Sequence, residues 1–122
     1  MRFVKKKIPI LGVCLGHQIL GYFAGAKVKP ARNILHGKTS PIYFKKEEKI
    51  FNGIPSPTTM TRYHSLLVYP QKVQVLEVIA WTKEKEVMGL KYIDRPWYGV
   101  QFHPESVLSE NGPKILENFL NL

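Results

Sequence analysis

The order of apolar and polar residues predicts a short buried strand followed directly by a helix near the start of the chain. Ile8–Val13 is a short apolar run of the kind that forms a buried strand. Leu15–Ala24 carries apolar residues at positions 15, 19, 20, 23 and 24, which is helical spacing, and Gly25 is suited to end that helix. Met1–Lys7 is typical of the end of an earlier helix. We therefore expect Cys14 at a junction between a strand and a helix.

The middle of the chain consists of short β-type runs that glycine and proline residues separate. The expected strands are residues 26–28, 39–44, 58–64, 73–82, 87–93 and 98–102. Gly112 and Pro113 then open an amphipathic terminal helix. His36–Ser40 is polar and contains a glycine, so we expect a loop there. Arg62–Leu66 is expected to end a strand and to present backbone groups to a ligand.

A buried strand, a tight turn and a helix in succession are typical of a parallel α/β sheet. Only one such unit precedes the β-rich part of this chain. We therefore interpret residues 1–122 as a single partial α/β domain that lacks its first strands.

Composition limits the function further. The chain has 122 residues, of which 44% are hydrophobic and 22% charged, which is typical of one globular domain. A single cysteine excludes an intrachain disulfide framework and fits a reducing compartment. The histidines and the cysteine show no close spacing of metal ligands, so we expect no metal and no cofactor.

Hydropathy and charge also argue against a membrane-spanning, a secreted or a nucleic-acid-binding protein. No run reaches the ~18 apolar residues of a membrane helix. The first 26 residues resemble a secretory signal peptide, but Gly12, Gly16, His17 and Gln18 interrupt the apolar stretch, which favours a cytoplasmic protein. The net charge of +9 raises nonspecific affinity for polyanions. Since the lysines are scattered and no nucleic-acid motif is present, we expect a solvated basic surface.

Cys14 is the candidate nucleophile. Gly12 and Gly16 flank it at two residues on either side, as in a sharp turn from which a nucleophile protrudes and where side chains would crowd it. The start of the following helix favours a thiolate and directs the Leu15 N–H toward a developing oxyanion. The alternative is that Cys14 is a buried small apolar residue.

A thiolate nucleophile needs a base and then an acid for the leaving amine. His103 and Glu105 follow an expected strand and point the same way in an extended segment, so the carboxylate can orient the ring. The alternative is a surface turn without a role. Gln18 lies one helical turn after Cys14, where it can contact a substrate, whereas His17 faces another way and is expected to be a satisfied structural histidine.

Four ordered motifs resemble class I glutamine amidotransferase domains. They are Gly-Val-Cys-Leu-Gly-His-Gln at 12–18, His-Gly-Lys-Thr-Ser at 36–40, Arg-Tyr-His-Ser-Leu at 62–66 and Gly-Val-Gln-Phe-His-Pro-Glu-Ser at 99–106. The third and second are similar to those of the glutaminase subunits of anthranilate synthase and aminodeoxychorismate synthase. The resemblance implies a flavodoxin-like mixed sheet with flanking helices, of which this chain would be the C-terminal portion.

The resemblance also implies the chemistry. The implied catalytic triad is Cys14, His103 and Glu105. The implied glutamine contacts are Leu15, through its amide in the oxyanion hole, Gln18, Ser65 and Leu66. The family forms a glutamyl thioester on the cysteine, passes ammonia to a chorismate-utilising synthase subunit, and releases glutamate with water.

The start of the chain departs from the family pattern. Family members carry an upstream segment with the first strands and a loop whose glycine amide completes the oxyanion hole. Losing one such donor costs ~10²–10³ in rate, so we expect a weakly active or inactive fragment. An apolar sheet edge is expected to be exposed and to drive self-association.

Three alternatives stay open at this point. One is a product branch toward aminodeoxychorismate instead of anthranilate. Another is a non-catalytic binding subunit of the same fold. The third is a γ-glutamyl hydrolase or cysteine peptidase, which Gln18 and the motif at Arg62–Leu66 disfavour.

Overall fold

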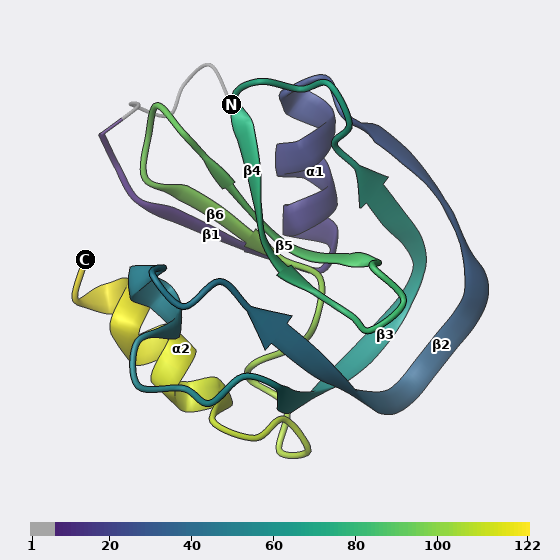
Figure 1. Ribbon diagram of the computed structural model, residues 1–122, viewed down its shortest axis with the longest axis vertical. Helices are drawn as coiled ribbons and strands as arrows, with labels where there is room; N and C mark the ends of the chain where they lie inside the picture. The colour runs from purple at the N-terminus through teal and green to yellow at the C-terminus, as the bar shows by residue number, and fades with distance from the viewer. Residues whose placement is uncertain (1–6) are drawn as a thin grey trace.

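The chain forms a mixed six-stranded sheet with two helices. The computed structural model describes residues 7–122, except the side chains of residues 32–38 and 63. In sheet order the strands are β1 (Ile10–Val13), β6 (Trp97–Val100), β5 (Val87–Tyr92), β4 (Leu76–Trp81), β2 (Lys27–Phe44) and β3 (Thr58–Tyr69). β1 and β6 run parallel, and the remaining neighbours are antiparallel (Figure 1). The expected α/β mixed sheet with flanking helices is confirmed.

Helix α1 (Leu15–Phe23) packs on the strands through its own hydrophobic cluster. Leu20 of α1 is buried there with Val68, Leu90 and Trp97. The hydroxyl of Tyr92 also donates a hydrogen bond of 2.6 Å to the Leu20 carbonyl oxygen. These contacts fix α1 beside β6 and β5.

Helix α2 (Gly112–Leu120) and the short 3-10 helix η1 (Lys49–Phe51) lie together over a second cluster (Figure 1). Ile115 is fully buried there with Phe51 and Phe102. Packing requires glycine at position 112, because a Cβ there would overlap the Pro104 carbonyl oxygen. The start of α2 is therefore pressed against the segment that carries His103 and Glu105.

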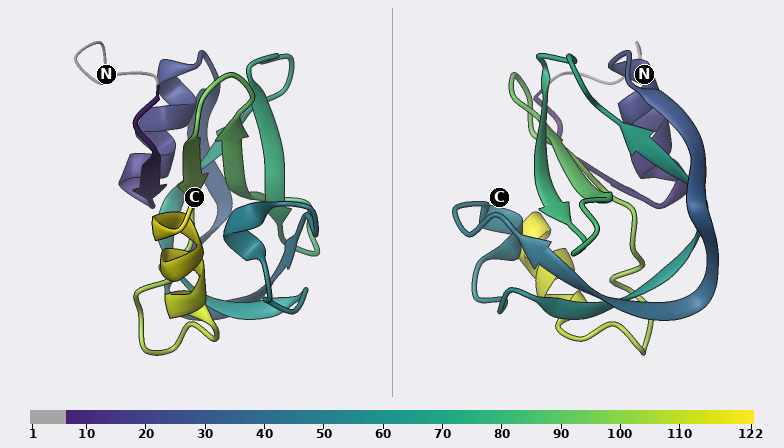
Figure 2. Two further views of the ribbon diagram at one scale, coloured as in Figure 1. Left: turned by 90° about the vertical axis from the view of Figure 1, so that its left-hand side faces the viewer. Right: turned by 45° about the vertical axis from the view of Figure 1, so that its right-hand side comes forward.

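Strands β2 and β3 form a long ribbon that curls around one side of the molecule (Figure 2). The expectation of separate strands at 26–28 and 39–44 with a loop at His36–Ser40 is wrong, because β2 runs unbroken from Lys27 to Phe44. The ribbon accommodates the polar residues through register shifts between Pro30 and Leu35 and between Leu35 and Lys38. β3 likewise continues past Leu66 to Tyr69, where it pairs with the start of β2.

The shorter elements agree with their predicted positions. β1, α1, β4, β5, β6 and α2 each lie within a few residues of the expected ranges. Gly25 follows α1 with a φ of 101°, a left-handed conformation that suits glycine. The helix end expected at Met1–Lys7 lies, apart from Lys7, outside the described residues. Among residues 7–122, no helix is long and apolar enough to cross a membrane.

Candidate active site

Cys14 occupies the turn between β1 and α1, as the sequence predicts. Its φ of 55° and ψ of −99° are strained for a residue with a side chain. Two backbone hydrogen bonds hold this turn: the Cys14 N–H donates to the Val100 carbonyl oxygen at 2.8 Å, and the Gln18 N–H donates to the Cys14 carbonyl oxygen at 3.1 Å. The conformation is therefore fixed by β6 on one side and by the first turn of α1 on the other.

Glycines let α1 approach β1 and β6 closely. A Cβ on Gly12 would lie 2.6 Å from the Gly16 carbonyl carbon, and a Cβ on Gly99 would lie 2.7 Å from Nδ1 of His17. Gly12 and Gly99 are register partners in the parallel pair of β1 and β6. The crowding argument is correct for Gly12 but wrong for Gly16, where an added Cβ would meet nothing within 4 Å.

Two buried glutamines lie beside the sulfur of Cys14. Nε2 of Gln101 is 3.6 Å from Sγ of Cys14, and Oε1 of Gln101 accepts a hydrogen bond of 3.3 Å from Nε2 of Gln18. The same Gln18 nitrogen donates to the Leu66 carbonyl oxygen at 3.4 Å. A polar chain therefore runs from β3 through α1 to the sulfur.

The half-buried thiol of Cys14 has a raised pKa. Burial is the largest cause, and the negative charge of Glu105 adds to it. Hydrogen bonds from the Leu15 backbone amide and from the Gln101 side chain act in the opposite direction and lower the pKa. The start of α1 thus favours the thiolate as expected, but desolvation of the sulfur outweighs this effect.

His103 and Glu105 meet directly after β6. Nδ1 of His103 and Oε2 of Glu105 are 2.6 Å apart, so the carboxylate contacts the ring. The backbone of this segment is anchored to β3, because the His103 N–H donates to the Thr61 carbonyl oxygen at 2.9 Å. The Ser109 hydroxyl bridges the two segments: it donates to the His103 carbonyl oxygen at 2.6 Å and accepts from the Thr61 N–H at 2.8 Å.

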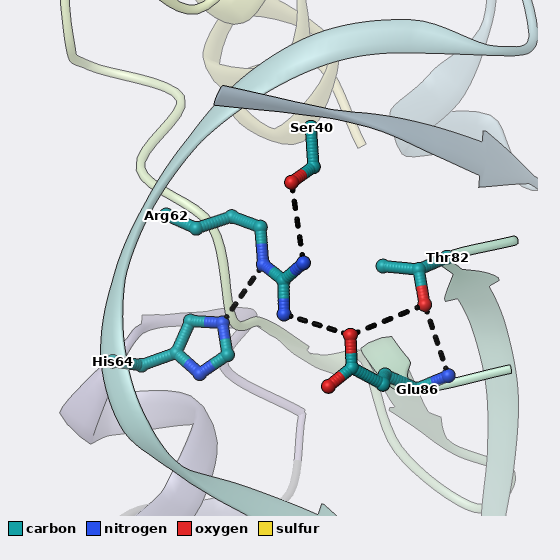
Figure 3. Close-up of polar contacts among 5 residues, drawn as sticks. All are labelled: Ser40, Arg62, His64, Thr82 and Glu86. Atoms are coloured by element: carbon teal, nitrogen blue, oxygen red, sulfur yellow. Dashed lines mark hydrogen bonds and ion pairs between the residues drawn. The ribbon is translucent and has the colours of Figure 1, made fainter. Parts of the chain in front are cut away.

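Arg62 is the centre of a polar network on β3 (Figure 3). Its side chain is only 3% exposed and pairs with Glu86 at 2.9 Å. Nη1 of Arg62 donates to the Ser40 hydroxyl at 3.2 Å, and Nε donates to Nε2 of His64 at 3.0 Å. The backbone N–H of Glu86 in turn donates to the Thr82 hydroxyl at 3.0 Å. The guanidinium thus links β2, β3 and the turn before β5.

His64 is held neutral by this network. Burial lowers its pKa to about 4, and the positive charge of Arg62 contributes in the same direction. Because Nε2 accepts from Arg62, the ring proton belongs on Nδ1. The Leu66 backbone acts on the same ring in the opposite direction and raises its pKa, but burial outweighs it.

The geometry described so far can be compared with known proteins. The model of the family "Glutamine amidotransferase class-I" matches residues 1–122. The chain belongs to the class I glutamine amidotransferase family.

Individual amidotransferases agree with this assignment. The chain is 47% identical over 99% of its length to aminodeoxychorismate synthase component 2 of Escherichia coli, and covers 65% of that protein. It is 48% identical over 93% of its length to anthranilate synthase component 2 of Pseudomonas aeruginosa, and covers 59% of it. The crystal structure of a glutamine amidotransferase from Thermotoga maritima superimposes with a TM-score of 0.75 at 23% identity, covering 98% of this chain and 48% of that one, which supports the fold. The chain thus spans less than two thirds of each of these relatives.

The structure brings together predicted site residues from distant segments. Cys14 and Gln18 lie with Gln101, and His103 contacts Glu105. The negative charge of Glu105 also acts on the Cys14 thiol. Ser65 and Leu66 on β3 are exposed, and the Leu66 carbonyl contacts Gln18. The Leu15 side chain is 65% exposed, while its amide acts on the sulfur.

Sequence reasoning missed Gln101 as a candidate site residue. It lies directly after β6 and inside the motif at 99–106 that also contains His103. That place in the motif is the signal that could have identified it. Sequence reasoning placed Arg62 only in a segment expected to present backbone groups to a ligand. Its side chain pairs instead with Glu86, which lies 24 positions away in the sequence.

His17 is fully buried, in agreement with the structural role that the sequence predicts. The Gly99 backbone beside its ring acts to raise its pKa, but a larger effect opposes this. Burial lowers its pKa to about 4. Two hollows lie elsewhere, around Lys46 and Asn52. The described residues contain no group of three or more potential metal ligands.

Proposed function

We propose that this chain carries the glutaminase site of a chorismate-utilising amidotransferase. Cys14 is the nucleophile, His103 is the general base and acid, and Glu105 orients the His103 ring. Leu15, Gln18, Ser65 and Leu66 contact glutamine, with the Leu15 amide in the oxyanion hole. The observation that carries this proposal is the strained turn at Cys14, where the sulfur accepts hydrogen bonds from the Leu15 backbone amide and the Gln101 side-chain amide.

The proposed reaction has two steps. The Cys14 thiolate attacks the side-chain carbonyl carbon of glutamine, the C–N bond breaks, and His103 gives a proton to the leaving ammonia. Water then attacks the thioester with His103 as base, so that glutamate leaves and the sulfur is restored. The Leu15 N–H stabilises the oxyanion in both steps.

The proposed fate of the ammonia is transfer to a chorismate-utilising synthase subunit. This part rests on the relatives, which are components 2 of aminodeoxychorismate synthase and of anthranilate synthase. Their identities of 47% and 48% favour neither product, so we keep anthranilate as the first proposal and aminodeoxychorismate as its alternative. A cytoplasmic location is part of the proposal, because the nucleophile must remain a reduced thiol.

A non-catalytic subunit of the same fold is the competing proposal. It is favoured by the raised pKa of the Cys14 thiol, since burial leaves less thiolate at neutral pH.

Intact mass after exposure to an electrophilic glutamine analogue separates the two proposals. A competent site gives one adduct on Cys14, which excess glutamine suppresses and excess asparagine does not. The Cys14→Ser variant is the control and must give no adduct. A folded sample that gives no adduct, or an adduct that glutamine leaves unchanged, would contradict the glutaminase proposal.

Self-association through an open sheet edge is a further part of the proposal. Within the described residues β1 pairs only with β6, and Ile8 next to it is 50% exposed. Leu15, Ile19 and Tyr22 add exposed apolar area on the outer face of α1. Light scattering should detect dimers or larger species at high concentration, and a monodisperse monomer would contradict this part alone.

A further inference from the structure

The two buried glutamines beside Cys14 have a fixed hydrogen-bond direction. A backbone carbonyl oxygen can only accept, so the Gln18 atom that faces the Leu66 carbonyl must be the amide nitrogen. That same nitrogen contacts Gln101, so the Gln101 atom that faces it must be the carbonyl oxygen Oε1. The amide nitrogen of Gln101 then faces the sulfur of Cys14. One backbone carbonyl on β3 thus sets the orientation of both side chains.

We propose that Gln101 is a catalytic residue, donating an N–H to the sulfur of Cys14, and that Gln18 is the positioning residue that aims it. The inference rests on the proposed role of Cys14 as nucleophile. It gives Gln18 a second task beside the glutamine contact proposed above. Gln101 is fully buried and Gln18 is 9% exposed, so water does not compete freely for either amide.

An N–H beside the sulfur matters most when the sulfur is charged. A hydrogen bond to an ionised acceptor is about twice as strong as one between neutral groups. The donor therefore stabilises the thiolate more than the thiol, and it opposes the desolvation that raises the pKa of Cys14. When the thioester forms, the sulfur loses its charge and this stabilisation with it.

Other ionisable groups also surround the site. They are His17 on α1, His64 on β3, and His103 and Glu105 after β6. The lowered pKa values of His17 and His64, each about 4, keep both rings neutral wherever a thiol titrates. His103 and Glu105 are unchanged in every variant below, so their influence cancels when variants are compared.

The test is the pH dependence of iodoacetamide alkylation, followed by intact mass. Because Cys14 is the only cysteine of the chain, the reaction midpoint reports its pKa without ambiguity. Gln101→Met preserves the side-chain length and removes the N–H, and we expect it to raise the midpoint by about one pH unit. Gln18→Met leaves the Gln101 amide free to turn and should raise the midpoint by roughly half as much.

Gln74→Met is the matched control, because Gln74 is exposed. Its midpoint should equal that of the parent chain. Unchanged midpoints in Gln101→Met and Gln18→Met, with unfolding transitions like the parent's, would overturn the inference. If Gln101→Met does not fold, the midpoint of Gln18→Met decides alone. Alkylation does not require glutamine binding, so the two proposals can fail separately. A shifted midpoint without a glutamine-protected adduct would show that Gln101 donates to the sulfur, but it would contradict the glutaminase proposal and with it the catalytic role of Gln101.

Discussion

The two sides of the site are held in place by different forces. On the β1, α1 and β6 side, backbone packs against backbone and side chain, and Gly12 and Gly99 leave no room for a methyl group. On the β3 side, Arg62 and Glu86 form an ion pair whose arginine is 3% exposed. Added volume should therefore damage the first side, and altered charge should damage the second.

This difference suits the chemistry proposed for each side. The nucleophile at Cys14 must hold a strained backbone conformation, and close packing resists its relaxation. The β3 segment presents Leu66 to Gln18 along a ribbon with irregular register. An ion pair and its hydrogen bonds can fix such a ribbon where regular pairing is interrupted.

The largest effect is expected from Gly12→Ala. Its Cβ would lie 2.6 Å from the backbone of Gly16, and a backbone atom cannot rotate away. α1 would have to move away from β1, so we expect a loss of about 3 kcal/mol or more in the free energy of unfolding, the upper range for overpacking. Urea denaturation followed by circular dichroism measures this loss.

Gly16→Ala is the matched control for that substitution. A Cβ at Gly16 meets nothing within 4 Å, and Gly16 lies inside α1. Alanine should therefore stabilise the protein by about 0.5–1 kcal/mol through its better helix propensity. Equal destabilisation by both alanines would mean that close packing does not distinguish the two glycines.

An intermediate effect is expected from Glu86→Gln. The change keeps the shape of the side chain but leaves the buried Arg62 without a charged partner. Removing one partner of a buried pair costs about 3–5 kcal/mol, and because Glu86 is itself 21% exposed we expect about 2 kcal/mol. Unfolding in urea at low and at high salt gives the value.

Ser40→Ala tests whether charge is the decisive property. Ser40 contacts the same guanidinium at 3.2 Å through a neutral hydroxyl. Its removal should cost only about 0.5–1 kcal/mol. A cost as large as that of Glu86→Gln would show that the network stabilises β3 through its hydrogen bonds and not through its charges.

Local patterns were sufficient for the elements whose stability is local. β1, α1 and α2 were predicted from apolar spacing and from Gly25, Gly112 and Pro113. The unbroken β2 could not be predicted, because the stretch at 36–40 is extended through pairing with β3, twenty or more positions away. Contact between distant segments overrides the loop signal of a glycine among polar residues.

The site shows the same limit. The motifs located Cys14, His103 and Glu105, because each motif is a continuous stretch of sequence. The contact of Gln101 with Gln18 joins residues 83 positions apart, and the Arg62–Glu86 pair is equally invisible in a linear pattern. Only the register of β6 beside β1 brings Gln101 to the sulfur.

Acid should weaken both sides, because each contains a buried neutral histidine. His17 on α1 and His64 on β3 have their pKa lowered from 6.5 to about 4 by burial. In the unfolded chain both take up protons below about pH 6.5, whereas the folded chain does not until about pH 4. Their contribution to stability is therefore present above pH 6.5 and is lost progressively as the pH falls toward 4.

The clearest pH dependence is expected from His17→Gln. One histidine with such a lowered pKa contributes about 3 kcal/mol to the loss between pH 6.5 and 4. The variant should therefore lose less stability than the parent when urea denaturation is repeated from pH 7 to pH 4.5. The variant should still lose the stability that depends on neutral His64, because the β3 side is unchanged. A variant that loses as much stability as the parent would contradict the lowered pKa of His17. It would mean that the folded chain protonates His17 over the same pH range as the unfolded chain, and that the close packing of α1 on Gly99 accommodates a charge.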